Sequence, residues 1–255
     1  MSPDQYCQQK AAGSGSSFYY SFLFLPAERR RAITALYAFC REVDDVVDEA
    51  TDLQVAQTRL AWWRAEIGRL FAGDPQHPVT RALSPAVQRF GVAAPLLNEI
   101  IDGVEMDLTQ SRYLDFAGLE RYCYRVAGVV GLLAAGIFGY RDAGTLGYAR
   151  DLGIAFQLTN IIRDVGEDAR RNRIYLPMED LKTYGVTAAD ITGARHSDAF
   201  VRLMRFEARR AEAYYDRALA ALPAQDRRAQ RPGLIMAAIY RTLLREIERD
   251  GFNVL

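Results

Sequence analysis

The chain has few of the residues from which disulfide frameworks and zinc sites are built. Its 255 residues include three cysteines, Cys7, Cys40 and Cys123, with no CxxC pair, and only two histidines. An odd number of cysteines without a paired spacing argues against a disulfide framework, and two histidines argue against a zinc site. We therefore expect free thiols in a reducing cytosol.

An excess of one charge and a long apolar run are also absent. Lys plus Arg and Asp plus Glu are 32 each, so the net charge gives no sign of a nucleic-acid partner. The longest apolar stretch, VAGVVGLLAAGIFGY, is short and rich in glycine for a membrane span, and the N-terminus lacks a signal-peptide layout. These features predict a cytoplasmic protein without nucleic-acid partners, soluble or peripheral on the inner face of the membrane.

Strand-like alternation is missing, whereas helical periodicity fills most of the chain. Apolar residues recur at three- and four-residue spacing over residues 28–49, 53–71, 96–108, 118–138, 143–170, 199–222 and 232–249. Turn residues such as Gly73, Pro177 and Pro223 separate these segments. Because no change in composition marks a linker, the pattern predicts one all-α domain over residues 1–255, a helical bundle, with residues 1–15 flexible.

The stretch REVDDVVDEA, residues 41–50, places three aspartates among valines. Helical spacing aligns Tyr37, Arg41, Asp44 and Asp48 on one face, with Asp45 beside them. Like charges four residues apart destabilise a helix by roughly 0.2–0.5 kcal/mol per pair, so a cation over this face would be favourable. A solvated acidic helix end is the alternative, and for one such cluster alone it is the more common case.

A second polar face strengthens the cation interpretation. Gln157, Asn160, Asp164 and Asp168 follow steps of three, four and four, with Arg163 one residue from that line. Magnesium takes oxygen ligands, typically one or two carboxylates together with substrate phosphates. A di-iron centre would need glutamates and an ExxH motif instead. Two aspartate pairs with nearby arginines therefore predict a magnesium and diphosphate site.

Apolar features indicate what lies beyond the diphosphate. Gly128, Gly131, Ala134 and Ala135 leave space on an otherwise bulky helix, either for close helix packing or for a long apolar ligand. The N-terminal stretch GSGSSFYYSFLFLP adds aromatics, which pack as core or line a hydrocarbon tunnel and stabilise carbocations. A diphosphate joined to a hydrocarbon is a prenyl diphosphate.

Four motifs, SSFYYSFLFLP, YAFCREVDDVVDE, YCYRVAGVVG and QLTNIIRDVGEDARRNRIYLP, resemble the squalene and phytoene synthase family. These enzymes join two prenyl diphosphates head to head. The motifs occur in order and span most of the chain, and they most resemble bacterial presqualene diphosphate synthases of the hopanoid squalene pathway. The resemblance implies an isoprenoid synthase bundle with a central apolar cavity. Relatives usually continue past GFNVL with a basic segment, which implies a truncated C-terminus.

The resemblance also implies roles for individual residues. Metal ligands are expected at Asp44, Asp45, Asp48, Asp164 and Asp168. Catalytic roles are expected for Tyr37, Arg41, Tyr122, Arg163 and Tyr175. Substrate contacts are expected from Ser17, Phe18, Phe22, Gln157, Asn160 and Tyr240.

The implied reaction condenses two farnesyl diphosphates to presqualene diphosphate and diphosphate, for squalene and hopanoid biosynthesis. Two or three Mg²⁺ ions assist ionisation, a cyclopropane then closes, and NADPH is not expected for this first half-reaction. Downstream pathway enzymes are expected partners. The alternatives are a phytoene or dehydrosqualene synthase, a complete squalene synthase and, more remotely, a non-catalytic assembly factor on the same fold. An assembly factor would be expected to have lost its aspartate motifs, and both are intact here.

Overall fold

The protein is built from helices packed around two apolar cores. A computed structural model of the whole chain describes residues 1–13, 21–49 and 52–255. In those ranges helices are joined by turns, and the only extended pairing is an isolated bridge between Arg112 and Ile174. The all-α prediction is confirmed.

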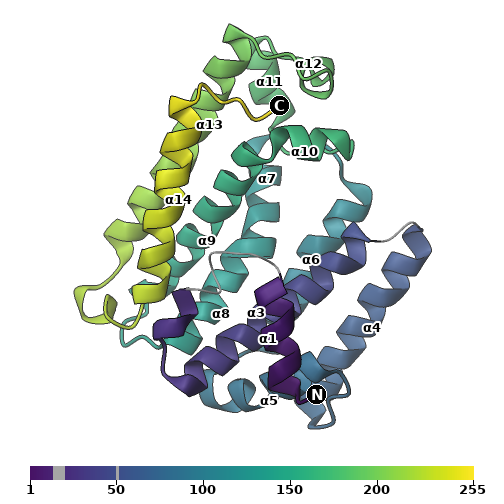
Figure 1. Cartoon of the computed structure of the whole chain (residues 1–255), viewed down its shortest axis with the longest axis vertical. Coiled ribbons are helices and arrows are strands. Elements are labelled where there is room, and N and C mark those ends of the chain that lie inside the picture. The colour runs from purple at the N-terminus through teal and green to yellow at the C-terminus, as the bar shows by residue number, and fades with distance from the viewer. Residues whose placement is uncertain (14–20, 50–51) are drawn as a thin grey trace.

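Most long helices lie where apolar periodicity predicted them. In chain order the elements are α1 (Pro3–Gly13), η1 (Phe22–Phe24), α3 (Ala27–Asp48), α4 (Leu53–Ala72), α5 (Pro78–Phe90), α6 (Ala94–Thr109), α7 (Phe116–Cys123), η2 (Tyr124–Gly128), α8 (Val129–Phe138), α9 (Gly144–Arg163), α10 (Val165–Arg170), α11 (Met178–Tyr184), α12 (Ala188–Thr192), α13 (Asp198–Ala221), η3 (Ala224–Asp226) and α14 (Arg231–Arg249). Figure 1 shows α13 and α14 side by side at one edge and α4 at the opposite edge.

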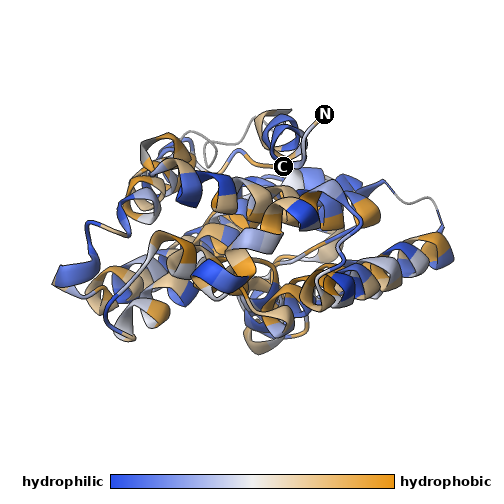
Figure 2. Ribbon diagram, turned by 90° about the horizontal axis from the view of Figure 1, so that it is seen from below, coloured by the Kyte–Doolittle hydropathy of each residue, from blue (hydrophilic) through white to orange (hydrophobic). Residues whose placement is uncertain are grey.

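Each half of the chain contributes one group of buried apolar side chains. In the first, α3 packs against α1, α5 and α6, with Leu36 and Phe39 fully buried. In the second, α9 packs against α13 and α14, around residues that include Tyr148 and Tyr215. Figure 2 shows apolar residues concentrated where the helices face one another. The helix formed by α7, η2 and α8 contributes to both groups and so joins the two halves.

Small residues on this joining helix allow unusually close packing. A Cβ atom on Gly131 would overlap the carbonyl oxygen of Ala149, and one on Gly153 would overlap that of Ala127. The segment Tyr124–Gly128 is a π-helix, a form found mostly as short insertions and often at functional sites. The helix Phe116–Phe138 is also long and apolar enough to span a membrane by length and composition alone. Because this helix contributes buried side chains to both apolar cores, it behaves as a core helix of the protein.

The structure corrects three expectations about the helices. Residues 1–15 were predicted to be flexible, but Pro3–Gly13 form α1, which buries Cys7 and Ala11. Helix α5 was not among the predicted segments; it contains two prolines, of which Pro78 lies in the first turn, where proline is tolerated. The predicted helix over residues 143–170 breaks at Asp164. The three cysteines are free, as predicted.

Candidate active site

A cavity of about 570 Å³ lies between α3, the η2–α8 segment, α9 and α14. On α3 its lining changes from Ile33 and Leu36 to Arg41 and Asp44 toward the C-terminal end of the helix. On α9 the lining changes in the same direction, and the polar members there are Gln157, Asn160 and Arg163. Both helices therefore present a polar end and an apolar end to one space.

The α3 wall brings together three of the residues that helical spacing aligns. Tyr37, Arg41 and Asp44 all line the cavity. Phe22 lines it too, is buried, and packs edge-on against Tyr37 with ring centroids 6.4 Å apart. Ser17 and Phe18 lie outside the described residues.

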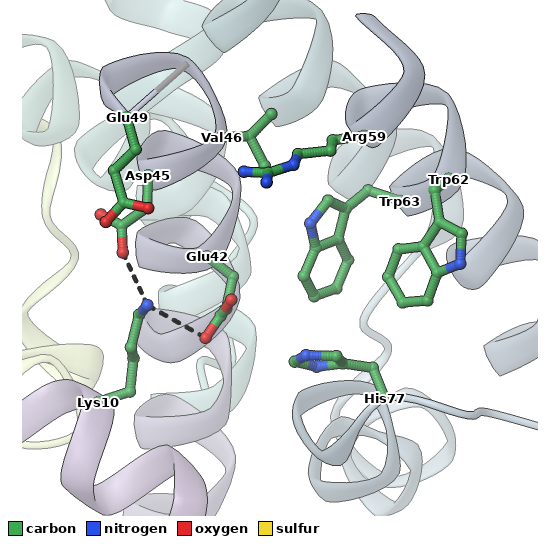
Figure 3. Close-up of a pocket in the computed structure, with 9 residues that line it drawn as sticks. All are labelled: Lys10, Glu42, Asp45, Val46, Glu49, Arg59, Trp62, Trp63 and His77. Atoms are coloured by element: carbon green, nitrogen blue, oxygen red, sulfur yellow. Dashed lines mark ion pairs between the residues drawn. The ribbon is translucent and has the colours of Figure 1, made fainter. Parts of the chain in front are cut away.

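The other two members of the first acidic motif, which comprises Asp44, Asp45 and Asp48, do not line this cavity. Asp45 lines a separate cavity of about 230 Å³ behind α3 and pairs with Lys10 of α1 (Figure 3). Asp48, the last residue of α3, lies 3.5 Å from the guanidinium of Arg173 and 3.8 Å from that of Arg171. Helical spacing had already placed Asp45 beside the line of Tyr37, Arg41, Asp44 and Asp48 rather than on it.

The α9 wall holds Gln157, Asn160 and Arg163, with Tyr240 of α14 beside them. The Oδ1 atom of Asn160 is buried and accepts no hydrogen bond from any described residue. Arg163 makes a bidentate pair with Asp164, with both N···O distances 2.6 Å. A bidentate guanidinium of this kind can exchange a carboxylate for a phosphate group.

The break between α9 and α10 shapes the second acidic motif, Asp164 and Asp168. The backbone N–H of Gly166 donates to the carbonyl oxygen of Val254 at 2.8 Å. A Cβ atom on Gly166 would lie 2.5 Å from the carbonyl carbon of Leu255. The C-terminal segment is therefore packed directly on the turn that presents Asp168.

Between the two motifs lies a carboxylate that the sequence-based site residues did not include. Tyr122 and Tyr175 each donate a hydrogen bond to Asp107 of α6, at 2.8 Å. Their rings stack with centroids 5.2 Å apart, and Tyr113 stacks on Tyr175. Neither Tyr122 nor Tyr175 lines the 570 Å³ cavity. Asp107 is one of four acidic residues on α6, so the sequence offered no signal that singles it out.

Burial, together with neighbouring negative charge, shapes the electrostatics of the polar end. Desolvation raises the pKa of Asp44 to about 7, and the charges of Asp48 and Asp107 add to the rise. Desolvation also raises the pKa of Asp168 to about 7, with contributions from Asp164 and Asp107. Because Asp107 acts on both groups, it lies within electrostatic range of both motifs.

The donor set fits magnesium bound together with a substrate. Carboxylate oxygens and the unpartnered amide oxygen of Asn160 are hard ligands, and the crowded carboxylates favour a divalent cation. Among the described residues no three His, Cys, Asp or Glu side chains form a group that could hold an ion. Water and the oxygens of a diphosphate would therefore have to complete the coordination, as is usual for Mg²⁺.

The chain is similar to known proteins over nearly its whole length. Residues 11–255 match the family described as squalene/phytoene synthase. The chain is 37% identical to a phytoene synthase of Arthrospira platensis over 97% of this chain and 84% of that protein. It is 36% identical to a 15-cis-phytoene synthase of Synechocystis sp. over 97% and 77% of the two chains.

Solved structures show the same fold. The squalene synthase HpnC of Alicyclobacillus acidocaldarius superimposes with a TM-score of 0.88 at 29% identity, over 99% of this chain and 95% of that one. A dehydrosqualene synthase in complex with a ligand gives 0.88 at 31% identity, over 99% and 88%. The chain therefore belongs to the squalene/phytoene synthase family and is a prenyltransferase with the isoprenoid synthase fold.

Proposed function

We propose that this protein joins two farnesyl diphosphates head to head, giving presqualene diphosphate and diphosphate. The observation that supports this is one cavity with Arg41, Asp44 and Arg163 at its polar end and aliphatic and aromatic side chains along the rest. A diphosphate suits the first region and a polyprenyl chain the second. The likeness to a squalene synthase of known structure, at 29% identity, also supports this reading.

The charged residues would act on the departing diphosphate. Asp44, Asp48, Asp164 and Asp168 would hold the magnesium ions. Bound Mg²⁺ supplies Lewis-acid stabilisation of the negative charge that develops on the leaving oxygens. Arg41 and Arg163 would bind the remaining oxygens, which requires Arg163 to give up its pair with Asp164.

The apolar lining would protect the carbocation formed when the allylic C–O bond breaks. With water excluded, the double bond of the second farnesyl chain supplies the electron pair for the new C–C bond. Loss of a proton then closes the cyclopropane. Burial raises the pKa of Tyr122 well above its usual value, and its hydroxyl already donates to Asp107, so it is a poor base. The released diphosphate is the better acceptor, with Tyr122 orienting it.

A second candidate is phytoene synthesis from two geranylgeranyl diphosphates. The observation that favours it is that the relatives at 36–37% identity are phytoene synthases. The two candidates use the same charged residues and differ in the length of chain that the apolar part of the cavity accepts.

Product analysis distinguishes the candidates. Purified protein would be incubated with Mg²⁺ and either farnesyl or geranylgeranyl diphosphate, with and without NADPH, and the products identified by mass spectrometry. The proposal expects presqualene diphosphate from the farnesyl substrate, unchanged by NADPH. Formation of squalene when NADPH is present would indicate a complete squalene synthase. Formation of dehydrosqualene without NADPH would indicate a carotenoid-type enzyme, and formation of phytoene would support the second candidate. An Asp44→Asn variant is the matched inactive control.

A further inference from the structure

Behind the α3 wall, a lysine from the N-terminal helix contacts the first acidic motif. The Nζ atom of Lys10 lies 2.7 Å from Oδ2 of Asp45 and 3.2 Å from Oε1 of Glu42. Figure 3 shows the Lys10 side chain extending from α1 to these two carboxylates on α3. All three side chains are more than two-thirds buried, so their charges are less screened than those of a surface pair.

The other oxygen of Asp45 connects this cluster to the active-site cavity. Oδ1 of Asp45 accepts a hydrogen bond from Nη2 of Arg41 at 2.9 Å. Arg41 lines the 570 Å³ cavity, whereas Asp45 and Lys10 line the 230 Å³ cavity on the far side of α3. Asp45 therefore bridges two cations, one on each side of the helix.

The Arg41 guanidinium has two carboxylate neighbours on its own helix, and Lys10 acts on only one of them. Asp44 lies 3.9 Å from Arg41 and lines the cavity, where its carboxylate could bind a metal ion. Asp45 is held from behind by Lys10, which fixes its carboxylate and neutralises part of its charge. Without Lys10, Asp45 could rotate, and uncompensated negative charge would lie close to Arg41.

Glu42 provides an internal comparison because it shares Lys10 but does not contact Arg41. Its carboxylate accepts a hydrogen bond from the Tyr6 hydroxyl at 2.7 Å and pairs with Lys10. Loss of Glu42 would weaken the packing of α1 on α3 and leave the contact between Asp45 and Arg41 in place.

We propose that Lys10 is a positioning residue that acts through Asp45 to hold Arg41 ready for a diphosphate. Asp45 is then a structural carboxylate of the site rather than an ion ligand. The inference rests on the proposed function in one respect, the assignment of a diphosphate to Arg41.

Binding of inorganic diphosphate tests the inference independently of product identity. Its affinity would be measured calorimetrically at fixed excess Mg²⁺ for the wild type, Lys10→Met and Lys10→Arg. We expect Lys10→Met to weaken binding by about 3- to 10-fold, a range typical of a partly buried charge contact, and Lys10→Arg to restore most of it. In the enzymatic assay, KM for the prenyl diphosphate should rise more than kcat falls.

Two further variants separate positioning from general stabilisation. Glu42→Gln removes a Lys10 partner without touching Arg41, and Lys182→Met removes an exposed lysine on α11 that pairs with no described carboxylate. Both variants should bind diphosphate with an affinity within about twofold of that of the wild type. This should hold for Glu42→Gln even where it lowers the melting temperature as much as Lys10→Met does. Equal affinities for Lys10→Met and wild type, or an equal loss in Glu42→Gln, would overturn the inference. A wild type that binds no diphosphate would overturn the proposed function first.

Discussion

The two acidic motifs present similar carboxylates from very different backbones. The first is on α3, a continuous helix of 22 residues, and its cations come from α3 itself, from α1 and from the segment after α10. The second is at a break between α9 and α10, and its nearest cation is its own neighbour Arg163. The first motif therefore depends on helix periodicity, and the second depends on a turn that packs against Val254 and Leu255.

This difference means that the two sides of the site should respond differently to change. A rigid helix keeps Asp44 in place whatever happens around it, so mutations there should alter chemistry more than structure. The turn at Asp164 relies on the contact of Gly166 with Val254 and Leu255. Mutations at that contact should first change the conformation of the turn, and the loss of activity should follow from that change.

The largest expected effect comes from removing one charge from each motif. Asp44→Asn and Asp168→Asn should each lower kcat/KM by about 10²–10³-fold, comparable to loss of one group that stabilises transition-state charge. Asp45→Asn should cost about tenfold or less, since Asp45 faces away from the cavity. Steady-state kinetics at saturating Mg²⁺ measure all three. A loss in Asp45→Asn as large as that in Asp44→Asn would show that Asp45 also binds an ion.

The next largest effect should come from a substitution that disrupts only the second motif. Gly166→Ala places a Cβ atom 2.5 Å from the carbonyl carbon of Leu255 and 2.7 Å from the Val254 oxygen, both backbone atoms. We expect destabilisation of about 1–3 kcal/mol, the usual cost of overpacking, with reduced activity. Denaturant unfolding measures the loss.

Gly147→Ala is the matched control because it makes the same change within α9. No described atom lies within 4 Å of the Cβ position of Gly147 except those of its own helix backbone and chain neighbours, so alanine should be neutral or stabilise by up to about 1 kcal/mol. Equal destabilisation by the two substitutions would mean that packing of the C-terminal segment on Gly166 is not what holds the turn.

Sequence reasoning located the first motif better than the second for the same physical reason. A helix predicted over residues 28–49 is observed as Ala27–Asp48, and regular spacing then places Tyr37, Arg41 and Asp44 on one face. The break at Asp164 depends on a contact with residues about ninety positions away, which local periodicity does not contain. The contacts of Asp45 with Lys10 and of Asp107 with Tyr122 and Tyr175 could not be predicted, because these partners come from other segments of the chain.

Smaller effects are expected from variants that test the role of Asp107, the carboxylate between the two motifs. Tyr122→Phe and Tyr175→Phe each remove one hydrogen bond to Asp107. Each should destabilise the protein by about 1.5–3 kcal/mol if Asp107 stays charged, and by about 1 kcal/mol if it becomes protonated instead. The double variant should lose more than the sum of the two, because Asp107 would then be left without either donor. Strict additivity in denaturant unfolding would contradict a shared role of the two tyrosines.

The smallest effect is one that the two motifs share, a dependence of stability on pH in the absence of metal. Asp44 and Asp168 have pKa values of about 7, above the ordinary value for aspartate, so near pH 6 the folded state binds more protons than the unfolded state. Their contribution therefore favours folding at low pH and is lost as the pH rises through about 7. Both carboxylates are partly exposed, so we expect the melting temperature to be only about 2 °C higher at pH 6 than at pH 8.

Metal ions should act in the opposite direction, because they bind the deprotonated carboxylates. The increase in melting temperature on adding Mg²⁺ and diphosphate should be larger at pH 8 than at pH 6. The Asp44→Asn and Asp168→Asn variants should each lose part of the metal-free pH dependence, and the double variant should keep only the part set by other groups, such as Glu207, whose pKa burial raises to about 8. If the double variant keeps the slope of the wild type, other groups set the pH dependence. If one single variant removes the whole dependence of the melting temperature on pH, the aspartates of the two motifs differ in protonation as well as in backbone setting.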